Sequence, residues 1–188
     1  AVVMEFESAA PVPDELVVDR PFLFVIHDTE HGAPLFVGRV AHEKNIGFLL
    51  EALIHARQLR PDVLLVVAGE GPAMDDLKAQ VKNLGLRDSV QFIGYLDRQA
   101  ALPDCYAAAN AFVFASRTET QGLVLLEAMA AGLPVIALSE MGTTDILSPG
   151  RGAISPPAEV KAFGETLGNF LNQPSAWHHL RQEAPVYA

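Results

Sequence analysis

From residue 34 onward, short apolar runs alternate with longer segments whose apolar residues recur at helical spacing. The apolar runs predict strands at residues 34–39, 62–71, 89–96, 111–116, 134–139 and 152–155. The segments between and after them predict helices at residues 46–59, 73–86, 101–110, 122–132, 143–148, 159–171 and 175–184. Because the strands are apolar throughout instead of alternating with polar residues, we expect both faces of their sheet to be buried. The pattern therefore predicts a doubly wound α/β fold, with a parallel sheet of about six strands and helices on both faces.

The first 33 residues break this rhythm. Residues 1–20 are acidic and contain prolines, a composition that is typical of a linker. Residues 22–26 (FLFVI) form an apolar run long enough for a short strand. We therefore expect an N-terminal extension over residues 1–33 and one Rossmann-like domain over residues 34–188. Because the chain begins with Ala instead of Met, we also expect it to be a piece of a longer protein.

Charge and composition exclude some classes of partner. The 188 residues are 50% hydrophobic, enough for a sizeable core, and carry a net charge of −10. Nucleic acids and anionic membranes attract proteins of the opposite sign, so we expect no nucleic-acid partner. The longest apolar stretch, at 123–138, is interrupted by Glu127 and is too short for a transmembrane segment. The single cysteine, Cys105, excludes an internal disulfide and fits a reducing, cytoplasmic location.

Two cations gather in the loop that follows the expected strand at 34–39. In this loop, GRVAHEKN, Gly38 and Arg39 reach the carboxyl edge of the sheet, and Lys44 stands where the next helix begins. Arg as a planar fork and Lys as a point charge are side chains that bind phosphate oxygens. The alternative is two ordinary surface cations, although a cation at the start of a helix opposes the helix dipole. For His42, which lies between them, a contact with the same ligand is left open.

A second polar loop, at 116–122, leads into an apolar helix. The helix begins with amides that have no intrahelical partner and can bind an anion, those of Gly122, Leu123 and Val124. Glu119 precedes these amides, and Glu127 lies more than one turn inside the helix. Carboxylates accept hydrogen bonds from sugar hydroxyls. The alternatives are a capping role for Glu119 and a salt bridge on the helix for Glu127.

These loops carry a resemblance to a known family. Four segments, in order within residues 34–155, resemble the donor-binding half of retaining GT-B glycosyltransferases of the glycosyl transferases group 1 family: GRVAHEKN (38–45), VVAGEGP (66–72), VQFIGYL (90–96) and SRTETQGLVLLEAMAAGLPVIA (116–137). Glu119 and Glu127 match the E-x7-E motif of that family. Four ordered segments are more specific than any one of them.

The resemblance implies a role for each site residue. Arg39 and Lys44 match the basic pair that holds the donor diphosphate, and Glu119 matches the acid that orients hydroxyls of the transferred sugar. Glu127 matches the acid that binds the ribose hydroxyls. Further residues are implied to lie along the donor site, with the base near Tyr95 and Leu96: Gly38, Gly69, Gly71, Tyr95, Leu96, Gly122, Leu123 and Val124.

The resemblance also implies the chemistry. Cleavage of the bond between sugar and diphosphate puts negative charge on the leaving phosphate, which Arg39, Lys44 and the helix amides would stabilise. No metal or other cofactor is then required, and no enzymic nucleophile is expected. The parent enzyme is expected to transfer a hexose from a UDP- or GDP-linked donor, with retention of configuration, in polysaccharide or glycolipid biosynthesis. This chain alone should bind the donor and catalyse little.

The sequence departs from the family pattern in ways that affect the expected partners and leave alternative functions open. We expect the family's N-terminal domain, which supplies the acceptor site, to lie outside this chain, and E-T-Q-G at 119–122 replaces the more common E-G-F-G. The expected partners are a nucleoside-diphosphate sugar and that N-terminal domain, and peripheral membrane association of the parent is left open. Two alternatives remain, a non-catalytic nucleotide-binding module and another GT-B enzyme such as a sugar-nucleotide epimerase.

Three other polar features are not expected to form sites. Residues 27–31 (HDTEH) hold four potential metal ligands but lack the H-E-x-x-H spacing of a helical metal site. Asp75 and Asp76 stand at the start of a predicted helix, where acids favour the helix dipole. Cys105 is expected to be a small apolar residue of a helix.

Overall fold

The computed structural model describes residues 2–5, 15–18, 22–26, 40–97, 101–147, 151–173, 175 and 177–188. Its main feature is a six-stranded sheet with the order β5-β4-β3-β6-β7-β8, in which all neighbouring strands are parallel. The strands are β3 (Phe22–Ile26), β4 (Leu64–Ala68), β5 (Val90–Gly94), β6 (Ala111–Phe114), β7 (Val135–Ala137) and β8 (Ala153–Ile154). The chain runs outward from β3 in both directions, which confirms the predicted doubly wound arrangement.

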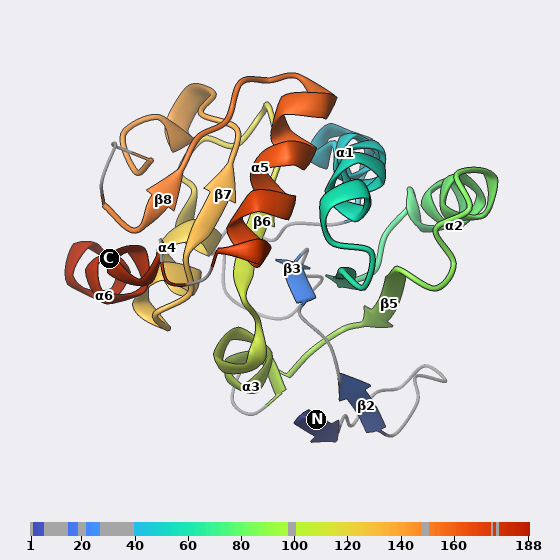
Figure 1. Cartoon of the computed structure of the whole chain (residues 1–188), viewed down its shortest axis with the longest axis horizontal. Helices are drawn as coiled ribbons and strands as arrows, with labels where there is room; N and C mark the ends of the chain where they lie inside the picture. The colour runs from blue at the N-terminus through green and yellow to red at the C-terminus, as the bar shows by residue number, and fades with distance from the viewer. Residues whose placement is uncertain are drawn as a thin grey trace.

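Helices cover both faces of this sheet (Figure 1). The six helices of the described chain are α1 (Ile46–Leu59), α2 (Met74–Asn83), α3 (Ala101–Ala108), α4 (Leu123–Ala130), α5 (Val160–Asn172) and α6 (His178–Tyr187). Buried hydrophobic residues of α1, α2 and α5 belong to one hydrophobic cluster. Those of α3 and α4, together with Ala184 of α6, belong to a second. Within the described residues, no helix is both long and apolar enough to cross a membrane.

The continuous apolar strands explain why the core has two halves. In β4, Leu64 and Val66 point into the cluster with α3 and α4, whereas Leu65 and Val67 point into the cluster with α1 and α5. All five residues of β4 are buried. Because successive side chains of a strand point to opposite faces, only an apolar run without alternation can fill both clusters.

The helix pair α1 and α5 packs especially closely. Gly164 and Gly168, one helical turn apart on α5, face Ala52 and Ala56 of α1, and the space for a Cβ at either glycine is already taken. Phe163 of α5 contacts Phe48 of α1 edge to face, with ring centroids 5.3 Å apart. Small residues in facing positions therefore let the two backbones approach, and the aromatic pair fills the space beside them.

The N-terminal region corrects the sequence prediction. Residues 2–5 and 15–18, expected within a linker, form the antiparallel strands β1 (Val2–Glu5) and β2 (Glu15–Val18). The short apolar run 22–26 is β3, at the centre of the main sheet between β4 and β6. A domain start at residue 34 is therefore too late, because the sheet includes β3. The expected strand at 34–39 lies outside the described residues.

Elsewhere the predicted and observed elements agree to within a few residues. The exception is the helix expected at 143–148, where the structure has the 3-10 turn η2 (Met141–Thr143). Gly85, two residues after the end of α2, has a φ of +68°, the left-handed conformation that favours glycine at a helix C-terminus. Between β3 and β6 the connections turn to opposite sides, so the carboxyl ends of these two strands mark the switch point where such sheets bind ligands.

Replacing Gly164 by Ala tests the close packing of α5 on α1. The new Cβ would lie 2.2 Å from the backbone oxygen of Ala52, so the helices must separate. We expect the free energy of unfolding to fall by about 1–3 kcal/mol, although Ala is the better helix former. Urea unfolding measures the change. The exposed neighbour Glu165, replaced by Ala, is the control and should change stability little; equal effects of the two variants would contradict the packing.

Candidate functional site

The turn that carries Lys44 is held against the carboxyl end of β4. Val40 donates its amide to the Glu70 carbonyl at 2.9 Å, and its own carbonyl accepts the amide of Ala73 at 3.0 Å. A Cβ on Gly71 would lie 2.4 Å from the Val40 oxygen, so only glycine fits there. Residues 42–44 then form the 3-10 turn η1 (His42–Lys44), which leads into α1. The glycine turn after β4 thus fixes where the Lys44 loop begins.

Lys44 and Glu119 meet across the switch point. Nζ of Lys44 lies 3.2 Å from Oε2 of Glu119, although the two residues are 75 positions apart in the chain. Both side chains are largely buried, with 16% and 14% of their surface exposed. A partly buried ion pair is screened less than a surface pair, so each charge strongly influences the other. The two predicted loops therefore come together at the predicted edge of the sheet.

The Glu119 carboxylate also caps the start of α4. Its Oε1 accepts the amides of Gln121 and Gly122, at 3.4 Å and 3.3 Å. Burial by itself raises the pKa of the Glu119 carboxyl group, but the Lys44 ammonium and these hydrogen bonds outweigh burial and hold the pKa below its ordinary value. Glu119 is consequently ionised at neutral pH. The predicted capping alternative and the ion pair are both present in this structure.

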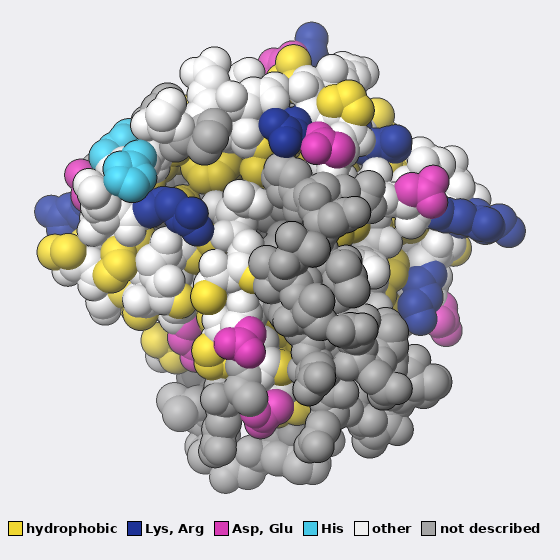
Figure 2. Space-filling view, turned by 60° about the horizontal axis from the view of Figure 1, so that its bottom comes forward, with side chains coloured by type: hydrophobic (Ala, Val, Ile, Leu, Met, Phe, Trp, Pro, Cys, Tyr) yellow, Lys and Arg dark blue, Asp and Glu magenta, His cyan; other side chains and the backbone are white. Residues whose placement is uncertain are grey.

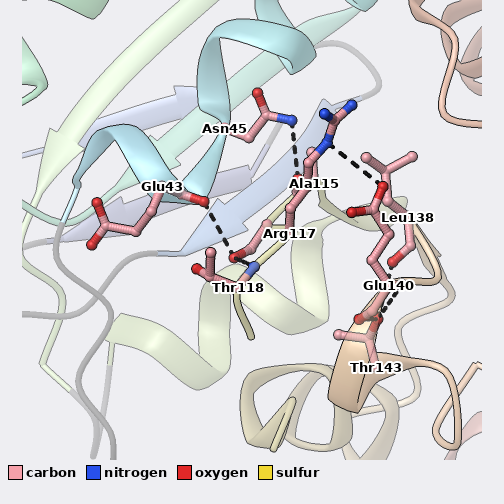
Figure 3. Close-up of polar contacts among 9 residues, drawn as sticks. Glu43, Asn45, Ala115, Arg117, Thr118, Leu138, Glu140 and Thr143 are labelled. Carbon is pink, nitrogen blue, oxygen red and sulfur yellow. Dashed lines mark hydrogen bonds and ion pairs between the residues drawn. The ribbon is translucent and has the colours of Figure 1, made fainter. Parts of the chain in front are cut away.

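Hydrogen bonds on either side of Lys44 join the two loops (Figure 3). Nδ2 of Asn45 donates to the Ala115 carbonyl at 3.2 Å, and Oγ of Ser116 donates to the Glu43 carbonyl at 3.4 Å. Ser116 is fully buried. Sequence reasoning did not single out Asn45 or Ser116, because neither residue type indicates a contact so remote in sequence.

The turn after β7 supports the same loop from the other side. The Glu119 carbonyl accepts the amide of Gly142 at 3.1 Å, and a Cβ on Gly142 would lie 2.0 Å from the oxygen of Thr120. Arg117 forms an ion pair with Glu140 at 3.6 Å, drawn in Figure 3. These contacts fix the backbone that carries Glu119. They involve residues after β7 that sequence reasoning did not assign to the site.

The structure describes most, but not all, of the other predicted site residues. Gly38 and Arg39 lie outside the described residues. Glu127 lies on α4 and is exposed. The remaining residues lie at the strand and helix ends of this edge: Gly69 after β4, Tyr95 and Leu96 after β5, and Gly122, Leu123 and Val124 at the start of α4. The structure thus joins Lys44 directly to Glu119, whereas the joint action of the whole set stays a prediction.

The features not expected to form sites can be placed as well. Oδ2 of Asp76 lies 3.4 Å from Nε2 of His42, and both side chains are exposed. Cys105 is buried in α3, and burial together with Asp104 raises the pKa of its thiol to about 12. The HDTEH segment lies outside the described residues. On the face seen in Figure 2, the coloured Lys and Arg side chains stand apart from one another, with Asp and Glu among them.

Together, the fold and the charged pair define a doubly wound α/β domain with a largely buried ion pair at the carboxyl edge of its sheet. Residues 26–186 match the model of the glycosyl transferases group 1 family, and the chain belongs to this family. The predicted family membership is therefore confirmed.

Individual relatives agree with this assignment. Alpha-monoglucosyldiacylglycerol synthase of Streptococcus pneumoniae is 46% identical over 150 residues, which cover 79% of this chain and 34% of the synthase. The structure of sucrose-phosphate synthase from Thermosynechococcus elongatus superposes with a TM-score of 0.76 at 27% identity, covering 92% of this chain and 41% of that one. The pneumococcal O-GlcNAc transferase GtfA, solved with UDP and GlcNAc, has a TM-score of 0.74 at 21% identity, covering 98% and 34%, and shows the fold alone. The chain spans about a third of the curated relative it matches.

A second family model matches the N-terminal region. Residues 1–43 of the 188 resemble the serpin (serine protease inhibitor) family. This match covers less than a quarter of the chain and overlaps the glycosyl transferase match over residues 26–43. Four of the five residues of β3 precede residue 26, so the central strand of the sheet lies almost wholly outside the glycosyl transferase match.

The lowered pKa of Glu119 predicts a pH-dependent contribution to stability. Glu119 binds its proton less tightly in the folded protein than in the unfolded chain. Its contribution is therefore complete above the ordinary Glu pKa of about 4.3 and is lost as the pH falls through the lower folded value. Glu119→Gln should cost about 1 kcal/mol at neutral pH and progressively less toward pH 3. Urea unfolding across this range measures the difference between the two proteins.

Glu165→Gln is the matched control for this experiment. Glu165 pairs with Lys161 at 3.8 Å on the exposed side of α5, so its replacement should cost little at any pH. A loss of stability in Glu119→Gln that stays constant from pH 7 to pH 3 would contradict the ionic role of Glu119.

Proposed function

We propose that this chain is the nucleotide-sugar donor-binding domain of a retaining glycosyltransferase, and that its parent transfers a hexose from a nucleoside-diphosphate sugar. The observation that carries the proposal is the Lys44–Glu119 pair at the switch point, in a chain of the glycosyl transferases group 1 family. A phosphate requires a cation, and sugar hydroxyls require an acceptor. Lys44 and Glu119 supply both, side by side.

In the proposed mechanism, Lys44 acts on the leaving group. As the bond between the sugar and the diphosphate breaks, negative charge grows on the departing phosphate oxygen. An ammonium group held at that oxygen stabilises this charge more strongly in the transition state than in the bound donor. The amides at the start of α4 add positive potential there. Arg39 is proposed as a second cation, and the proposal includes no metal.

Glu119 is proposed to bind the transferred sugar. Its lowered pKa keeps the carboxylate an acceptor of hydrogen bonds at neutral pH. With the diphosphate bound, the Lys44 ammonium turns toward the phosphate, and the Glu119 oxygen that it contacted accepts a sugar hydroxyl. Glu127 is proposed to accept hydrogen bonds from the ribose hydroxyls. The acceptor then attacks the face from which the diphosphate departs, and the phosphate takes the acceptor's proton.

The identity of donor and acceptor rests on the relatives. UDP and GlcNAc are present in the solved GtfA structure, which favours a UDP-linked donor here. The name of the pneumococcal synthase favours a lipid acceptor for the parent, with peripheral association at a membrane. The parent's acceptor domain would complete the cleft, and product analysis of the full-length parent separates sugar transfer from epimerisation.

Replacing Lys44 by Ala tests the diphosphate contact. Loss of a charge-assisted hydrogen bond should weaken the binding of UDP to this chain by roughly 1–3 kcal/mol, or about 5- to 150-fold in Kd. Isothermal titration calorimetry measures the affinity. Lys82→Ala removes the same charge from the exposed end of α2 and should leave the affinity within about twofold. Equal affinities of wild type and Lys44→Ala would remove Lys44 from the site.

Replacing Glu127 by Ala tests the ribose contact. The variant should lose about 1 kcal/mol of UDP affinity, because one acceptor of ribose hydroxyls is gone, and should bind pyrophosphate as the wild type does. Calorimetry with both ligands gives the comparison. Equal losses for UDP and pyrophosphate would indicate a change in folding instead of a lost ribose contact.

A further inference from the structure

The loop that carries Glu119 holds both residues that flank Lys44 in the sequence, Glu43 and Asn45. Before Lys44, the Glu43 carbonyl accepts the Ser116 hydroxyl at 3.4 Å. After Lys44, the Asn45 side chain donates to the Ala115 carbonyl at 3.2 Å. Both contacts join segments more than 65 residues apart in sequence, and they bracket the residue whose ammonium meets Glu119.

Asn45 occupies an unusual position for a residue at the start of a helix. It is the N-cap of α1, where an Asn side chain ordinarily accepts an amide of the first turn. Here its φ is +56°, and within the described chain its side chain makes no capping hydrogen bond. Asn tolerates this left-handed conformation better than most residues. Its amide is thus turned away from its own helix and toward the end of β6.

Ser116 performs the matching role from the other loop. Its buried Oγ donates to Glu43 and accepts the amide of Thr118 at 3.4 Å. One hydroxyl therefore connects the Lys44 turn to the backbone that leads into Glu119. Figure 3 shows both connections between the two loops.

We propose that Asn45 and Ser116 are positioning residues that hold Lys44 and Glu119 in register for the donor diphosphate. The inference rests on the proposed donor-binding function. A lysine ammonium on four rotatable bonds binds a phosphate well only if its backbone is already placed, because ordering that backbone during binding would reduce the affinity. Asn45 and Ser116 supply this order before the ligand arrives, and neither needs to touch the donor.

Two replacements of Asn45 separate its hydrogen bond from its backbone conformation. Asn45→Asp keeps the size and the tolerance for positive φ, but its carboxylate cannot donate to the Ala115 carbonyl. Asn45→Gly keeps the conformation and removes the side chain. We expect both variants to bind UDP and pyrophosphate about 5- to 20-fold more weakly than the wild type, as for the loss of one hydrogen bond. Ser116→Ala should act in the same direction.

Asn172 provides the matched control. Its Nδ2 donates to the Leu59 carbonyl at 2.9 Å, an amide-to-backbone contact of the same kind between α5 and the end of α1. Asn172→Asp removes that donor in the same way, and we expect UDP affinity to stay within about twofold of wild type. Thermal unfolding of all variants shows whether each is folded at the temperature of the titrations.

A double-mutant cycle tests whether Asn45 acts through Lys44. In the Lys44→Ala background, Asn45→Asp should change the affinity for pyrophosphate by less than about twofold, because the group that it positions is gone. A purely structural role would give the same loss in both backgrounds. Additive effects, or an Asn45→Asp protein that is folded and binds UDP as tightly as the wild type, would overturn the inference.

Ligand binding by the wild-type protein distinguishes a failure of this inference from a failure of the proposed function. If wild-type protein binds neither UDP nor pyrophosphate, the donor-binding function and the positioning role fall together. If it binds both and Lys44→Ala weakens binding while Asn45→Asp and Asn45→Gly do not, only the positioning role falls. The positioning role is supported if both Asn45 variants lose affinity while Asn172→Asp does not, and if the effects of Asn45→Asp and Lys44→Ala are not additive.

Discussion

The ion pair between Lys44 and Glu119 depends on where two strands of a parallel sheet end, β4 and β6, which flank the central strand β3. Lys44 lies on the turn held beside the end of β4, and Glu119 lies on the loop after β6. Each loop by itself would carry a flexible charge in solvent. Once the two charges are brought together and largely buried, the Lys44 ammonium lowers the pKa of Glu119, and the Glu119 carboxylate accepts an amide at the start of α4.

The rest of the domain maintains that meeting point. Apolar strands buried on both faces fix the sheet, and the close contact of Gly164 with Ala52 fixes α5 against α1, the helix that follows the Lys44 turn. Gly142 fixes the far side of the Glu119 loop by backbone contact with Thr120. Glycine is needed at these points because the backbones touch there. An added Cβ at Gly164 would separate the two helices, and one at Gly142 would displace the loop that carries Glu119.

The central strand is the feature that family similarity describes least. β3 pairs with β4 and β6 in parallel, although it lies almost wholly before the part of the chain that matches the glycosyl transferases group 1 family and within the part that resembles serpins. A strand at the centre of a parallel sheet must above all be apolar on both faces, because both faces are buried. Residues 22–26 (FLFVI) satisfy this requirement, as does 34–39, so composition alone does not choose between the two runs.

The sequence by itself determined the alternation of strands and helices, the glycine at the end of α2, and the two charged loops, because these signals depend on residues a few positions apart. Glu119 and Lys44 were found by residue type and spacing. Tertiary structure alone decided that β3 is the central strand, that Asn45 turns its amide to Ala115, and that Ser116 joins Glu43 to Thr118. The physical reason is that a hydrogen bond between residues about 70 positions apart produces no local pattern in the sequence. Any donor that the fold brings close to the acceptor could form it.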